Sequence, residues 1–130
     1  AALGINPYQN KNNYGIVTDI IAAIIVVPVI ETFVFQYCSH LILRKINLIK
    51  KQQNFRIVYL IISTILFCLS HYYSIAYILA MIFPGLILAY FFNFFYLQMN
   101  YKNAIYFTVL IHLLTNTIAV IDEHFLNNLL

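Results

Sequence analysis

The chain has 130 residues, of which 63% are hydrophobic and only 8% are charged, and its mean hydropathy is +0.85. This composition excludes an ordinary water-soluble domain, in which about a quarter of the residues are charged. The net charge of +3 does not point to nucleic-acid binding, because the basic residues flank apolar segments and no groove-reading motif accompanies them. The chain is therefore predicted to be a membrane protein with room for about four spans of roughly 20 residues each.

Four apolar runs follow one another along the chain. Residues 1–14 are a polar lead-in, 15–121 are predicted to form one transmembrane domain, and 122–130 are a C-terminal tail. The runs are continuous and lack the alternation of membrane strands, so the fold class is all-α: a polytopic membrane bundle of about four transmembrane helices. The predicted spans are 16–43, 57–74, 75–97 and 104–121. Pro84 removes a backbone donor, so the third helix is predicted to be kinked or broken near Pro84 and Gly85.

The basic residues gather in one connection between the first two spans. Positions 44–56 hold five of the seven Lys and Arg residues: Arg44, Lys45, Lys50, Lys51 and Arg56. By the positive-inside rule, this loop faces the cytoplasm of an integral membrane protein. His40 lies beside the loop and His124 lies in the tail, so both are expected to be solvated or interfacial.

A few polar side chains lie deep inside the predicted spans. Glu31 is the one acid in the middle of an apolar run, where a charge costs about 2.5–3.5 kcal/mol. Counted from the cytoplasmic ends at about 1.5 Å per residue, Glu31, His71, His112 and Asn116 all lie roughly 15–22 Å deep. His112 and Asn116 are four residues apart and share a helix face. Interhelical hydrogen bonding could explain any one of them, but their matched depth favours a common site.

This set of side chains suits several kinds of chemistry. A carboxylate and an imidazole can activate water, while a second imidazole and an amide can stabilise an oxyanion, as a peptide hydrolase requires. Glu31, His71 and His112 could instead hold zinc or another divalent metal. Spacing does not decide between these two, because no HExxH helix is present. Axial haem ligation by the two histidines is disfavoured by a carboxylate at the same depth.

Three short segments resemble the ordered motifs of a known family. The segments ETFVFQ (31–36), FCLSH (67–71) and HLLTN (112–116) resemble the motifs EExxxR, FxxxH and HxxxN of the CPBP family, which comprises type II CAAX prenyl endopeptidases and bacteriocin-processing, Abi-like relatives. The segment GLILAYFFNFFY (85–96) is similar to the family's linking helix, so the resemblance covers 27–116.

The resemblance implies an intramembrane endopeptidase. In that family Glu31 and His71 would activate water, and His112 and Asn116 would bind the oxyanion. The implied partner is a membrane-associated peptide or lipidated protein, such as a prenylated (CAAX-type) substrate or a leader peptide, and no nucleic acid is implied. The substrate is expected to enter from the cytoplasmic side. A metal-free site without a cofactor is favoured, and a site that holds zinc or another divalent metal is the alternative. The resemblance to this family and the small size of the chain together predict a protein of a bacterial cell membrane.

The first motif departs from the family pattern at two positions. Thr32 replaces the second Glu and Gln36 replaces the Arg. On an ideal α-helix Gln36 lies about 140° from Glu31, which places it off the same narrow face, so both residues are interpreted as supporting groups. The alternative function is a catalytically inactive relative that acts as a membrane binding or immunity protein.

Overall fold

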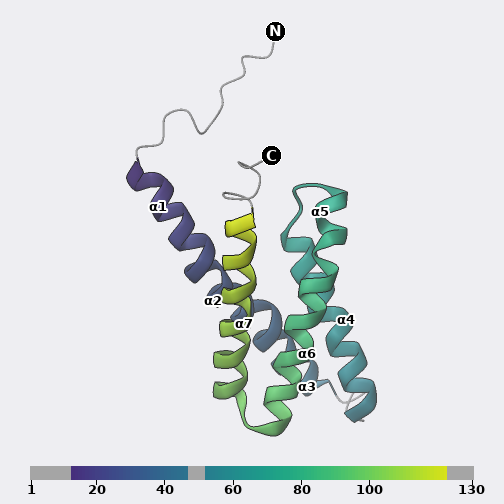
Figure 1. Ribbon diagram of the computed structural model, residues 1–130. Helices are drawn as coiled ribbons and strands as arrows, with labels where there is room; N and C mark the ends of the chain where they lie inside the picture. Colours follow the sequence, from purple (N-terminus) through teal and green to yellow (C-terminus); the bar gives the residue numbers. More distant parts are fainter. Residues whose placement is uncertain (1–12, 47–51, 123–130) are drawn as a thin grey trace.

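The protein is a bundle of four helical rods (Figure 1). The computed structural model describes residues 13–46 and 52–122, so the lead-in up to residue 12, loop residues 47–51 and the tail from 123, His124 included, lie outside the described residues. The first rod joins α1 (Asn13–Ile21), η1 (Ala22–Val26), α2 (Val27–Glu31), η2 (Thr32–Cys38) and α3 (Ser39–Lys45) end to end. The other rods are α4 (Gln52–Ser70), α5 (Ile75–Ala80) with α6 (Ile82–Gln98), and α7 (Tyr101–Ile121).

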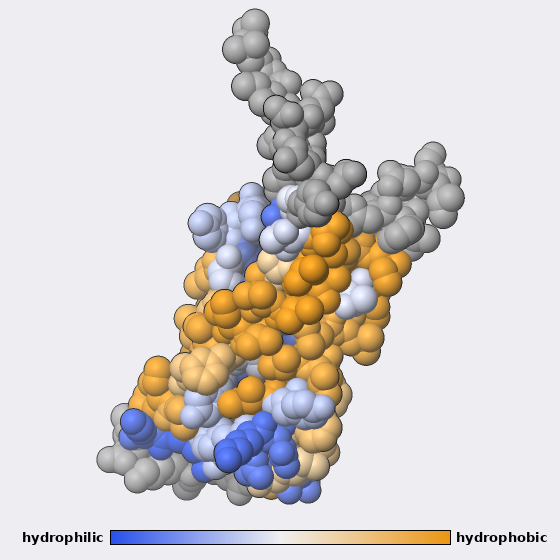
Figure 2. All heavy atoms as spheres, turned by 90° about the vertical axis from the view of Figure 1, so that its left-hand side faces the viewer, coloured by the Kyte–Doolittle hydropathy of each residue, from blue (hydrophilic) through white to orange (hydrophobic). Residues whose placement is uncertain are grey.

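The rods have the length and surface of membrane spans. Three helical stretches are long and apolar enough to cross a bilayer, namely Val17–Lys45, Ile75–Gln98 and Tyr101–Ile121, and α4 contributes a shorter apolar helix, Asn54–Ser70. A broad apolar band lies between more polar ends on the face that includes α1 (Figure 2). The predicted all-α membrane bundle is therefore confirmed, with both ends of the described chain opposite the α3–α4 connection (Figure 1).

The third rod is interrupted, as the sequence predicts. The break lies at Met81, three residues before Pro84, where α5 ends and α6 begins. The backbone N–H of Met81 bonds the carbonyl of Tyr77, and Ile82 starts a new helix. Pro84 then falls in the first turn of α6, where a missing N–H costs no hydrogen bond. The proline therefore marks the start of the second helical piece.

The first rod contains two π-helical segments, η1 and η2. Their wider turns leave backbone carbonyls for other donors, and α4 supplies hydroxyls to them. The hydroxyl of Ser63 donates to the carbonyl of Phe35 at 2.8 Å, and that of Tyr59 donates to the carbonyl of Gln36 at 3.3 Å. The irregular backbone is thus tolerated in an apolar bundle because neighbouring side chains donate hydrogen bonds to its carbonyl groups.

The π-helical geometry corrects the angular position expected for Gln36. Five residues separate Gln36 from Glu31, which is about one turn when hydrogen bonds run from i to i+5. Gln36 is fully buried, as is Thr32 one residue after Glu31. The expectation of a large angular offset was wrong, because it assumed 3.6 residues per turn.

The packed core lies at the basic-loop end and is centred on His40, which is fully buried. Its Nδ1 lies 3.2 Å from the Tyr101 hydroxyl, and its Nε2 lies 3.4 Å from Oδ1 of Asn93. Five aromatic rings pack edge-on against the imidazole: Phe55, Tyr59, Phe92, Tyr96 and Tyr101. The expectation of a solvated or interfacial His40 was therefore wrong, because rings from α4, α6 and α7 cover it.

Gly85 allows α6 to approach α4 closely. A Cβ at this position would lie 3.0 Å from Cδ1 of Phe67 and 3.3 Å from Cγ2 of Thr64. Phe67 in turn packs against the rings of His71 and His112, at centroid distances of 4.7 and 5.7 Å. The small residue on α6 therefore determines where Phe67 holds the two histidines.

We expect Gly85→Ala to lower the free energy of unfolding by about 1–3 kcal/mol, because the added methyl overlaps a buried ring. The measurement is thermal or denaturant unfolding in detergent. The double variant Gly85→Ala/Phe67→Leu is the control, and it should recover part of the loss because the smaller side chain makes room. Equal stability of Gly85→Ala and the unsubstituted protein would contradict the close-packing argument.

Candidate active site

Glu31 lies between two imidazoles that come from different rods. Its Oε1 is 3.5 Å from Nε2 of His71, which follows the end of α4, and its Oε2 is 3.4 Å from Nε2 of His112 on α7. The Glu31 side chain is only 15% exposed. An isolated buried carboxylate would be costly, so its two partners stabilise it at this depth.

The proton on His71 can be assigned from its surroundings. Its Nδ1 lies 2.8 Å from the backbone carbonyl of Phe67, which can only accept, so Nδ1 carries a hydrogen. Nε2 of a neutral ring therefore has a lone pair that faces Glu31. Two acceptors 3.5 Å apart can share a proton, which stabilises the pair, or both accept from one water molecule that lies beside them in the cavity. This arrangement suits a general base.

His112 is held by the first rod. Its Nδ1 lies 3.2 Å from the Thr32 hydroxyl. The His112 side chain is only 3% exposed. Thr32, one of the two departures from the family pattern, thus orients an imidazole of the site, which is a supporting role.

Asn116 lies one turn beyond His112 on α7. Its Nδ2 donates to the backbone carbonyl of Ala23 at 3.1 Å. This bond engages one of the two amide hydrogens and leaves the other available. The amide thus connects α7 to η1 and also lines the cavity beside Glu31.

A cavity of about 280 Å³ opens beside these groups. Its walls come from the first rod, the α4–α5 turn, the start of α6 and the end of α7. Beside Glu31, His71, His112 and Asn116 it is lined by Ala23, Val27, Phe67, Tyr77, Met81, Pro84, Thr115, Ala119 and Val120. The four residues predicted to share a site therefore line one cavity in the structure.

The position of the cavity differs from the expected entry side. On the first rod the lining residues extend from Glu31 to Ala23, and on α7 they extend from His112 to Val120. The cavity therefore lies between the Glu31 layer and the two ends of the described chain. The other side of the Glu31 layer, towards the basic loop, is packed around His40. Entry from the loop side was expected, but the packed core closes that side.

The donor atoms are also candidate metal ligands. The two imidazole nitrogens face different oxygens of Glu31, at 3.5 and 3.4 Å. Within residues 13–46 and 52–122, no group of three His, Cys, Asp or Glu side chains is arranged to hold a metal ion.

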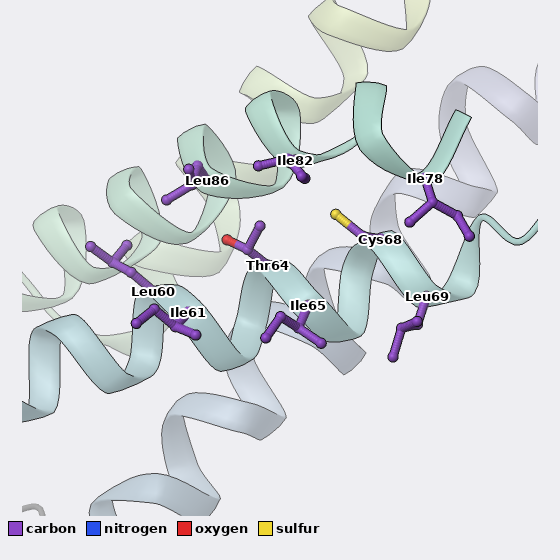
Figure 3. A pocket seen from close by; sticks show the side chains of 9 residues that line it. All are labelled: Leu60, Ile61, Thr64, Ile65, Cys68, Leu69, Ile78, Ile82 and Leu86. Carbon is purple, nitrogen blue, oxygen red and sulfur yellow. The ribbon is translucent and has the colours of Figure 1, made fainter. Parts of the chain in front are cut away.

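A second cavity of about 330 Å³ lies between α4 and the third rod. Its lining is almost wholly apolar (Figure 3) and consists of Leu60, Ile61, Thr64, Ile65, Cys68, Leu69, Ile78, Ile82 and Leu86. Cys68 and Ile82 are the chain neighbours of Phe67 and Met81, which line the first cavity. This groove has no acid–base group and suits a hydrocarbon chain.

Sequence reasoning did not find every residue that builds the site. Tyr77 and Met81 line the cavity but looked like ordinary apolar filler. Pro28, which is fully buried in the first rod one turn before Thr32, had a usable signal, because proline inside a long apolar helix removes a backbone donor.

Fold and site together define a polytopic helical membrane protein with a Glu–His–His group and an amide beside one intramembrane cavity. A family model for type II CAAX prenyl endopeptidases, Rce1-like, matches residues 13–118. The chain therefore belongs to this family of CAAX-type intramembrane endopeptidases. No curated protein and no solved structure matches the chain.

We expect Thr32→Val to lower the rate of peptide cleavage by up to about tenfold, because one hydrogen bond that orients His112 is lost. The measurement is the initial rate in proteoliposomes. Thr108→Val is the matched control, since this buried threonine on α7 lines neither cavity and should leave the rate unchanged. Equal rates for Thr32→Val and the unsubstituted protein would refute a role of Thr32 in orienting the imidazole.

We expect Gln36→Met to raise the free energy of unfolding by about 1–3 kcal/mol. Within the described part of the chain, neither side-chain polar atom of Gln36 has a hydrogen-bond partner, although the residue is fully buried. Methionine has a similar shape and removes the unpaired amide. A fall in melting temperature would show instead that the amide is hydrogen-bonded.

Proposed function

We propose that the protein hydrolyses a peptide bond of a membrane-associated substrate at the cavity beside Glu31. The observation that carries this proposal is the placement of one carboxylate between two imidazoles on the wall of a cavity that also presents Asn116. General base, proton carrier and oxyanion donors are the parts that hydrolysis of an amide needs. The retention of this whole set favours an enzyme over an inactive binding or immunity relative.

In the proposed reaction, Glu31 and His71 bind the nucleophilic water. Because Nδ1 of His71 donates to the Phe67 carbonyl, Nε2 and the carboxylate both present lone pairs to this water. They take one proton as the water oxygen adds to the scissile carbonyl carbon. The same proton then passes to the leaving nitrogen as the C–N bond breaks, so that the Glu31–His71 pair returns to its first state.

The charge that develops on the carbonyl oxygen needs hydrogen-bond donors. We assign this role to His112 and to the amide hydrogen of Asn116 that does not bond Ala23. His112 is buried and held by Thr32, so its ring is positioned before the substrate arrives. Preorganised donors of this kind stabilise the transition state more than the ground state. The catalytic type proposed is therefore glutamate-dependent and metal-free.

The apolar groove between α4 and the third rod supports a lipidated substrate. It lies next to the catalytic cavity through Cys68 and Ile82 and has the lining that a hydrocarbon chain needs. A prenylated C-terminal peptide could place its scissile bond at Glu31 and its lipid in this groove. A leader peptide without lipid would use the cavity alone.

We also propose an orientation in a bacterial cell membrane. The positive-inside rule places the basic loop in the cytoplasm, with Arg44 held over the rings of Phe55 and Tyr96 at that end. The cavity then opens towards the outer half of the bilayer, because it lies on the other side of the Glu31 layer.

The decisive experiment is cleavage of fluorogenic peptides by the protein in liposomes. We expect Glu31→Gln and His71→Ala to lower kcat by about 10²–10⁴-fold, because each removes a proton acceptor, while the helical content stays the same. Asp19→Asn is the control, since it neutralises an exposed acid on the same rod outside the cavity. Retained cleavage in either site variant would overturn the proposal.

A matched pair of peptides with and without a prenyl group tests the substrate class. A lower KM for the prenylated peptide is expected, because its lipid chain buries apolar surface in the groove. Equal KM values would point to a substrate without lipid.

A further inference from the structure

Pro28 lies inside the first rod, one turn before Thr32. It is fully buried, although its neighbours Val27 and Val29 are more than 40% exposed. Proline in the interior of a helix costs about 3 kcal/mol, so this position calls for a compensating interaction. A contact with α7 supplies one.

This contact arises from the hydrogen that Pro28 lacks. In η1 the N–H of Val27 bonds the carbonyl of Ala22, five residues back. By the same spacing of five residues, the backbone nitrogen of Pro28 would bond the carbonyl of Ala23, but a proline nitrogen carries no hydrogen. The carbonyl of Ala23 therefore faces a partner outside the rod, and it accepts from Nδ2 of Asn116 at 3.1 Å.

The contact fixes the amide next to a second residue of the site. His112 and Asn116 are four residues apart on α7, which matches one helical turn, and Nδ1 of His112 lies 3.2 Å from the Thr32 hydroxyl of the first rod.

We propose that Pro28 is a positioning residue that orients Asn116. Its missing N–H leaves the Ala23 carbonyl free to bind the Asn116 amide. The kinetic consequence rests on the proposed function, because it assumes that Asn116 binds the oxyanion. The structural part stands by itself, since it concerns only what the Asn116 amide bonds.

The test compares two replacements that differ in one group. Pro28→Ala restores a backbone N–H, which can bond within the rod and compete with Asn116 for the Ala23 carbonyl. Pro28→lactic acid, introduced as an ester at the same position, has the same methyl side chain and no N–H. Both lose the proline ring equally, so any difference between them reports the N–H.

We expect Pro28→Ala to lower kcat at least tenfold with little change in KM, because misplaced donors act only in the transition state. The ester variant should recover to within about twofold of the unsubstituted protein. The side-chain amide signal of Asn116, followed by NMR with labelled asparagine, should shift in Pro28→Ala and not in the ester variant.

Two results would overturn the proposal: an unchanged kcat and Asn116 signal in Pro28→Ala, or identical behaviour of the two variants. A merely structural role of Pro28 would change the melting temperature of both and leave kcat alone. If the unsubstituted protein cleaves nothing, the proposed function fails, and the Asn116 signal still decides whether Pro28 orients the amide.

Discussion

A carboxylate inside an apolar bundle must have partners, and the rest of this structure depends on how Glu31 obtains them. The two imidazoles that flank it come from the end of α4 and the middle of α7. Both rods must therefore meet the first rod at one depth, and Phe67 packs behind both imidazoles. Gly85 lets α6 lie close to that ring. The position of a single charged group is thus connected to the packing of all four rods.

The bundle has two unequal halves on either side of this layer. Towards the basic loop, polar side chains such as His40 and Asn93 are hydrogen-bonded among aromatic rings, so the described residues are closely packed there. Towards the ends of the described chain lies the cavity. In the proposed function the packed half keeps the site in place and the open half admits the substrate, because preorganised groups must be held rigidly.

The first rod shows how an irregular helix can hydrogen-bond to the neighbouring rods through its backbone. Two π-helical segments and one proline free backbone carbonyls that a regular helix would use internally. Those of Phe35 and Gln36 accept from the Ser39 hydroxyl of the same rod and from α4, and that of Ala23 accepts from α7. These carbonyls therefore connect the rods inside a bilayer whose hydrocarbon offers no hydrogen-bond donor.

The sequence by itself determined the fold class and which polar side chains line one cavity. Apolar runs of these lengths leave helices as the only spanning structure, and the cost of burying Glu31, His71 and His112 predicts that they meet. Counting depth succeeded because the rise per residue is nearly constant. Only the tertiary structure decided that His40 is buried, that Gln36 faces the interior, and that the cavity opens away from the basic loop. The burial of His40 and the position of the cavity depend on contacts between segments far apart in the chain. The position of Gln36 depends on a π-helical turn, which contains more residues than the 3.6 of a regular α-helix.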